Sequence, residues 1–187
     1  MRADKHLPGE TGVWVFIGGD LMIFGLFFLT FMVYRGRDPA LFVESQRTLN
    51  QTCGLINTIL LLTSSWFVAL AVHGARSRWT KAVPRLFVFA FLCGVGFGAI
   101  KILEYSEKIT AGMTITTNDF FMFYFMFTGI HFVHVLIGMG VLAYLFNVSR
   151  KIDLGPGDIP VLESGAAFWH LVDLLWIVLF ALFYLMR

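Results

Sequence analysis

Long apolar stretches alternate with short polar segments along the whole chain. A helix that crosses a bilayer needs about 20 mostly apolar residues, and five stretches have the required length and character. They lie at about residues 12–34, 51–75, 84–105, 120–146 and 164–186. The segments between them, such as RGRDPALFVESQ and RKIDLGPGDIP, are rich in residues that favour turns. The pattern therefore predicts five transmembrane helices joined by short loops.

The same pattern predicts how these helices are organised. Only helices and closed barrels satisfy backbone hydrogen bonds in lipid, and no segment between the spans could fold as a soluble domain. We find no internal repeat in the sequence. We therefore expect an all-α polytopic membrane protein in which one bundle of five transmembrane helices occupies residues 1–187.

Composition supports a membrane protein and excludes several other classes. Hydrophobic residues make up 58% of the chain and charged residues 14%, and the mean hydropathy is +0.77. That leaves too little polar surface to cover a soluble core. The net charge is +2 without a basic run suited to nucleic acid. Cys53 and Cys93 lie in different apolar stretches, so neither a disulfide framework nor a zinc motif is indicated.

The distribution of lysine and arginine predicts the orientation of the chain. The first apolar stretch is too long for a signal peptide and has no cleavage pattern, so we expect it to remain as a helix. Eight basic residues fall on the side of the N-terminus: Arg2, Lys5, Arg76, Arg78, Lys81, Arg85, Arg150 and Lys151. Five fall on the other side, namely Arg35, Arg37, Arg47, Lys108 and Arg187, and Lys101, inside a span, is not counted. The excess favours a cytoplasmic N-terminus and a C-terminus on the opposite side.

Ionisable side chains inside the predicted spans are the candidate functional residues. A charge at the centre of a membrane helix costs about 2.5–3.5 kcal/mol on insertion scales, so such residues usually have a partner or a function. The stretch TGIHFVHVLIG places two histidines three residues apart, and a histidine and an aspartate repeat that spacing in the last span. The candidates for a buried polar, lipid-related or proton-related role are Asp20, Glu104, His131, His134, His170 and Asp173.

Three interpretations of these residues are open. Metal binding is disfavoured, because two histidines three apart on one helix cannot bind opposite faces of one haem. A di-iron bundle needs Glu-x-x-His motifs, and no glutamate here precedes a histidine at that spacing. The second interpretation is that the side chains hydrogen-bond to one another and hold the helices in register. The third is that the cluster binds a lipid headgroup or influences proton movement.

Small and polar residues indicate where helices pack. Gly94 and Gly98 form a GxxxG motif in the third span, and Gly18 and Gly25 recur seven residues apart in the first; small residues let membrane helices approach closely. We expect helix-packing roles for Asn57, Ser64, Ser65, Gly94, Gly98, Trp169 and Trp176.

The order of motifs resembles a known family. The stretches LINTILLLTSS, ILEY, FTGIHFVHVLIG and ESGAAFWHLVDLLWIVLF resemble, in that order, the signatures of subunit III of haem-copper respiratory oxidases. Asp20 occupies the place of a buried carboxylate in that family, where many members have glutamate, and Lys101 stands where many have glutamine. Long members have seven spans and this chain has five. The opening GETGVWVFIGGD looks most like the subunit-III-like protein associated with nitric oxide reductase in denitrifying bacteria.

The resemblance implies a non-catalytic accessory subunit in the bacterial inner membrane. Such a subunit has no redox centre of its own, holds phospholipid in a cleft, and supports proton uptake and the durability of the active site. Haem, with copper or iron, would belong to the catalytic partner subunit. The alternatives are a small stand-alone transporter or proton-conducting protein, for which inverted repeats would be expected, and an autonomous haem enzyme.

Overall fold

The computed structural model describes residues 11–77, 82–151, 155 and 157–186. In chain order the helices are α1 (Thr11–Arg37), α2 (Pro39–Arg47), α3 (Gln51–Arg76), α4 (Val83–Thr110), α5 (Asp119–Ser149) and α6 (Asp158–Phe180), followed by the π-helical turn η1 (Ala181–Leu185). Within these ranges the chain forms no β-strand. The predicted all-α fold is confirmed.

All of the helices except α2 are long enough to cross a bilayer. Helices α1, α3, α4 and α5, and α6 together with η1, have mean hydropathies of 1.9 to 2.3 in their most apolar windows. These five helices coincide with the five predicted spans, and the chain is a multi-pass membrane protein. The fifth helix begins at Asp158, six residues earlier than the predicted span, so the end of the preceding polar segment is helical as well.

Helix α2 is a departure from the sequence prediction, which treated RGRDPALFVESQ as a loop. Asp38 caps this helix, since its Oδ1 accepts a hydrogen bond from the Leu41 amide at 3.1 Å. Pro39 occupies the first turn, where its fixed φ favours a helix and its missing N–H costs nothing. Phe42 is buried, with 2% of its surface exposed. A turn-forming Asp-Pro pair therefore starts a short helix that packs on the bundle.

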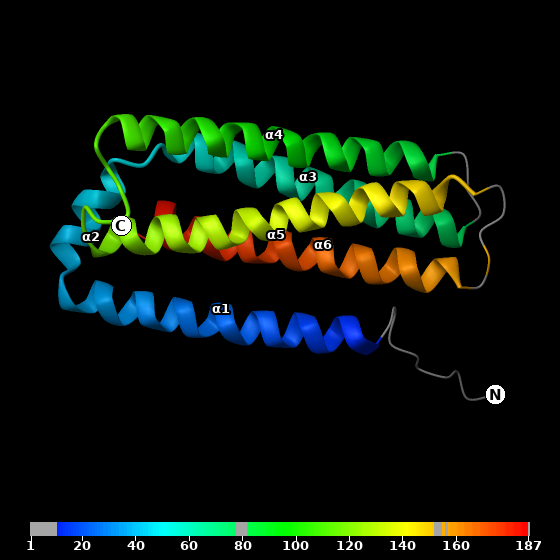
Figure 1. The fold of residues 1–187 in the computed structure, drawn as a ribbon, viewed down its shortest axis with the longest axis horizontal. Helices are drawn as coiled ribbons and strands as arrows, with labels where there is room; N and C mark the ends of the chain where they lie inside the picture. The colour runs from blue at the N-terminus through cyan, green and yellow to red at the C-terminus, as the bar shows by residue number, and fades with distance from the viewer. Residues whose placement is uncertain (1–10, 78–81, 152–154, 156, 187) are drawn as a thin grey trace.

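The helices run along one axis, with α1 at one edge of the bundle (Figure 1). Helix α6 packs against α1, α3 and α5. Within the most apolar window of α6 and η1, 67% of the residues are buried, compared with 17% for α1. We call the two ends of the bundle the α2 end, where α2 and η1 lie, and the loop end, where α1 begins. Helix α6 is therefore central and α1 is peripheral.

Glycines permit the close approach of α6 to its neighbours. A Cβ atom on Gly138 would lie 2.7 Å from Cε3 of Trp169, and one on Gly165 would lie 2.7 Å from Cδ1 of Leu145. A Cβ atom on Gly94 would lie 3.3 Å from Cη2 of Trp169. By contrast, a Cβ on Gly18 or Gly25 would meet nothing within 4 Å. Those two glycines of α1 are not used for packing within the described part of this chain.

Aromatic side chains hold the second half of α1 against the bundle. The Phe31 ring is fully buried and makes edge contacts with three rings from other elements: Phe42 at 5.4 Å, Phe123 at 5.8 Å and Phe183 at 5.1 Å between centroids. Such aromatic pairs contribute about 0.5–1.5 kcal/mol each beyond area burial. Helix α1 is thereby anchored at the α2 end.

The glycine contacts lead to a stability prediction with a matched control on the same helix. Gly138→Ala should lower stability by about 1–3 kcal/mol, because the added methyl group overlaps the Trp169 ring. Gly140→Ala should be neutral or stabilise by up to about 1 kcal/mol, because its Cβ meets nothing within 4 Å and alanine favours helix. Thermal unfolding of the detergent-solubilised variants checks this. Equal midpoints for the two variants would contradict the packing described.

Candidate functional site: polar side chains inside the bundle

Three polar groups that contain predicted candidate residues lie in the described part of the bundle, and each joins different helices. The first is an Asp20–His134 pair between α1 and α5. The second joins Ser65 of α3 to His170 of α6. The third, the Lys101 cluster, comprises Lys101, Glu104, Tyr124 and Tyr184 and lies towards the α2 end.

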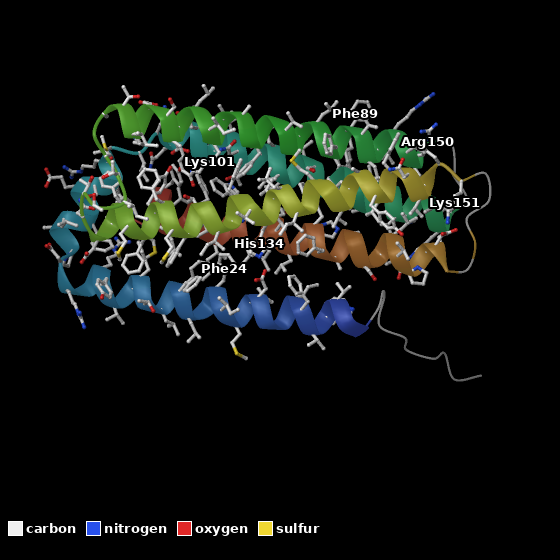
Figure 2. All side chains as sticks on the ribbon, in the orientation of Figure 1. Phe24, Phe89, Lys101, His134, Arg150 and Lys151 are labelled. Atoms are coloured by element: carbon white, nitrogen blue, oxygen red, sulfur yellow. The ribbon has the colours of Figure 1, made fainter. Side chains whose placement is uncertain are left out.

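Asp20 lies next to His134, with 3.2 Å between Oδ2 and Nε2. Figure 2 places His134 on α5 where it faces α1, with Phe24 beside it. The Phe24 and His134 rings meet edge to face at 5.7 Å between centroids. Only 11% of the aspartate side chain and 15% of the histidine side chain are exposed. Of the predicted candidate carboxylates, Asp20 is therefore the one that lies beside His134.

The other ring nitrogen of His134 determines what the pair can do. Its Nδ1 lies 2.9 Å from the carbonyl oxygen of Ile130, which can only accept, so Nδ1 carries a proton. Nε2 then faces the Asp20 carboxylate at 3.2 Å. No hydrogen bond of good geometry reaches Asp20 Oδ2 from the described residues, so the pair is a close polar contact that joins α1 to α5.

His131 does not share the surroundings of His134, although it lies only three residues earlier. The two side chains are about 60° apart around the helix, and His131 is fully buried on the side of α4 and α6. Its ring stacks on Trp176 at 5.4 Å and meets Phe97 edge-on at 5.7 Å. Neither of its ring nitrogens has a hydrogen-bond partner among the described residues. His131 therefore acts in this structure as an aromatic packing residue.

Ser65 joins α3 to α6 through a histidine. Its Oγ lies 2.5 Å from Nδ1 of His170, and the carboxyl group of Asp173 also lies beside the serine hydroxyl. Oδ1 of Asp173 has no hydrogen-bond partner in the described part of the chain. The i, i+3 pair of α6 thus converges on one serine and does not reach the histidines of α5.

Other predicted packing residues lie between α3 and its neighbours. Ser64 is fully buried and donates to the carbonyl of Ala90 at 2.8 Å. Trp176 donates its indole N–H to Thr58 Oγ1 at 3.0 Å. Asn57 is also fully buried, but neither atom of its amide has a partner in the described ranges. Ser64 and Trp176 therefore link helices by hydrogen bonds, whereas Asn57 does not in this structure.

Lys101 is the functional candidate that sequence reasoning set aside. Only 1% of its surface is exposed, and its Nζ donates to Glu104 Oε2 at 3.0 Å. It also contacts the hydroxyls of Tyr124 at 3.0 Å and Tyr184 at 3.2 Å. The i, i+3 spacing of Lys101 and Glu104 could have indicated this pairing. The tyrosines could not be identified from the sequence, because they come from helices whose relative register only the fold determines.

The described histidines and carboxylates do not gather into one cluster. No three His, Cys, Asp or Glu side chains lie close enough to hold a metal ion within residues 11–77, 82–151, 155 and 157–186. Each polar group instead joins two or three elements of the bundle. This geometry suits the fixing of helix positions.

An apolar groove lies at the loop end between α1, α3 and α6. Its volume is about 570 Å³, and its lining runs from Arg76, His73 and Glu163 to the apolar Leu21, Leu171 and Leu174. Arg76 and Glu163 form an ion pair at 2.7 Å. The groove is therefore charged at one end and apolar along its length.

Comparison with known proteins identifies the family. The sequence model for cytochrome c oxidase subunit III matches residues 9–187. The chain is 30% identical over 175 residues to quinol oxidase subunit 3 of Bacillus subtilis (strain 168), which covers 94% of this chain and 85% of that protein. It is 26% identical to cytochrome c oxidase subunit 3 of Bacillus sp. (strain PS3), over 100% of this chain and 98% of that protein.

These matches confirm the resemblance found in the motif order. They cover all five membrane helices described above. The chain therefore belongs to the cytochrome c oxidase subunit III family.

Proposed function

We propose that this chain is a non-catalytic accessory subunit of a haem-copper terminal oxidase. The observation that carries this proposal is the match of residues 9–187 to the subunit III family. The internal geometry supports it, since the buried histidines and carboxylates contact other side chains of the bundle. The role proposed is to assist the assembly and stability of the catalytic subunit.

The partner in this proposal is the haem-containing catalytic subunit of a respiratory electron transport chain. Haem, with copper or iron, would reside in that partner. Large apolar side chains cover the outside of the bundle, among them Leu26 at 59% exposure and Phe89 at 51%, and Figure 2 shows Phe89 on the outer side of α4. Such faces suit lipid or another membrane subunit.

The terminal electron acceptor in the proposal is oxygen. The relatives carry the names of quinol and cytochrome c oxidases, which favours oxygen over nitric oxide. The opening GETGVWVFIGGD is the feature that would connect the chain to nitric oxide reductase and denitrification. Consumption of oxygen or of nitric oxide by the purified complex distinguishes the two.

The proposed location is the bacterial inner membrane with the N-terminus in the cytoplasm. Eight basic residues against five support this orientation. On this basis the α2 end faces the periplasm and the loop end faces the cytoplasm. The groove between α1, α3 and α6 then opens at the cytoplasmic leaflet.

We assign this groove to a bound phospholipid. From Glu163 to Leu174 it follows α6 for eleven residues, or about 16 Å. That length equals about half of a hydrocarbon core of about 30 Å. Arg76 at the charged end would contact the phosphate through Nη1, because its Nε and Nη2 face Glu163. Val72, Leu171 and Leu174 would contact one acyl chain.

A variant of Arg76 tests the lipid site. Arg76→Met should reduce the phospholipid that co-purifies with the complex by about one molecule, because an arginine is the natural partner of a phosphate. Arg85→Met is the matched control, since Arg85 is an exposed cation at the loop end that does not line the groove. Lipid analysis by mass spectrometry provides the measurement. Unchanged lipid content in Arg76→Met would show that the groove does not hold phospholipid through this residue.

A variant of Asp20 tests the accessory role. Asp20→Ala should weaken retention of this chain in the complex or shorten the working lifetime of the complex, because it removes the contact of α1 with His134. It should leave the initial turnover within about twofold, since loss of a group that takes part in the reaction costs about 100-fold or more. Turnover and subunit retention of the purified complex are measured together.

Asp119→Ala provides the control for this experiment, because Asp119 is an exposed carboxylate at the start of α5. It should change neither retention nor lifetime. Complete loss of turnover in Asp20→Ala with the complex intact would make Asp20 a catalytic residue, and the accessory role would be wrong.

A further inference from the structure

The position of Lys101 requires a strong local partner. It lies nine residues before Thr110, the last residue of α4, which is about 13 Å from the helix end. Figure 2 shows Lys101 on the inner side of α4, and 1% of its surface is exposed. A lysine that deep cannot extend its ammonium to the membrane surface as lysines near helix ends do. The bundle itself must therefore accommodate the cation.

The hydrogen bonds of the ammonium are complete. An ammonium group has three donors, and Lys101 Nζ has three acceptors, at 3.0 Å on Glu104, 3.0 Å on Tyr124 and 3.2 Å on Tyr184. The carboxylate is also satisfied on both oxygens, because Tyr184 donates to Glu104 Oε1 at 2.5 Å. Each polar atom of the ion pair therefore has a partner within the protein.

Aromatic rings complete the surroundings of the cation. The Lys101 Nζ lies 5.2 Å from the ring centroids of both Tyr105 and Trp176. Tyr124 and Tyr184, whose centroids lie 4.7 Å and 5.7 Å away, instead present their hydroxyl edges to it. Rings within about 6 Å attract a cation through their negative faces, and several together form the aromatic cage that binds ammonium ligands in other proteins. The residues around Lys101 have the composition of a cation-binding site.

The cage is complete only when η1 packs against α4 and α5, because η1 contributes Tyr184. Tyr184 belongs to η1, where π-helical geometry leaves carbonyl groups without their usual helical partners. Gln51 of α3 donates to the carbonyl of Tyr184 at 2.6 Å, and Gln46 of α2 donates to the carbonyl of Leu182 at 2.8 Å. The Tyr184 side chain thus contacts α4 and α5, whereas the backbone of η1 accepts hydrogen bonds from α2 and α3.

We propose that Glu104, the hydroxyls of Tyr124 and Tyr184, and the rings of Tyr105 and Trp176 form a cation-binding cage whose ligand is the ammonium of the chain's own Lys101. The filled cage fixes η1 to α4 and α5. This role is internal to the subunit and does not depend on which complex the subunit joins.

Neutral variants of similar shape test the cage in the full chain purified with its partner subunits. Lys101→Met and Glu104→Gln each leave one buried charge unpaired, and each should lower the thermal midpoint by about 10 °C. The double variant contains neither charge. Its thermal midpoint should therefore fall by less than the sum of the decreases in the two single variants. Arg85→Met, which removes an exposed cation of α4, should leave the midpoint unchanged.

Spin-label mobility shows which part of the bundle is loosened by Lys101→Met. Spin labels at positions 185 and 92, both exposed in the native chain (58% and 56%), are introduced separately after replacement of Cys53 and Cys93. Lys101→Met should increase label mobility at 185 in η1 and leave it unchanged at 92 in α4. The proposal is overturned by additive losses in the double variant, by single losses no larger than that of Arg85→Met, or by equal mobility changes at both positions.

Discussion

The hydrocarbon core of a bilayer offers no hydrogen-bond partner, and this constraint organises the interior of the chain. An ionisable side chain placed there is stabilised by partners within the protein. Asp20 lies beside His134, Ser65 contacts His170, and Lys101 contacts Glu104 of its own helix together with two tyrosines. These contacts join α1 to α5, α3 to α6, and α4 to α5 and η1. The polar contacts thus add to the close apolar packing that holds these helices together.

Packing is close around α6 and sparse around the first half of α1. Helix α6 lies close to its neighbours because Gly138 and Gly165 leave room for Trp169 and Leu145. Helix α1 is fixed at the α2 end by Phe31 and midway by Asp20, but grooves flank its first half. A helix attached in this way is well suited to contact lipid on one side and a partner subunit on the other.

Sequence reasoning predicted the elements well and their contacts less well. Span length and hydropathy gave the five membrane helices, since both are local properties. The helix of Pro39 was missed because Asp-Pro favours turns and helix starts alike. His131 and His134 were grouped by spacing, yet a 60° difference directs them to different helices. Tyr184 could not be connected with Lys101, since that contact depends on the π-helical turn and on the register of three helices.

The central claim is that this subunit III family member carries no redox centre and works beside a subunit that does. Affinity purification through a tag on this chain, under mild and then under dissociating detergent conditions, tests it most directly. Under mild conditions the sample should contain a haem-bearing partner and show its absorption spectrum. After dissociation the isolated chain should be colourless and free of stoichiometric iron and copper. A stoichiometric haem spectrum that stays with the isolated chain would contradict the account.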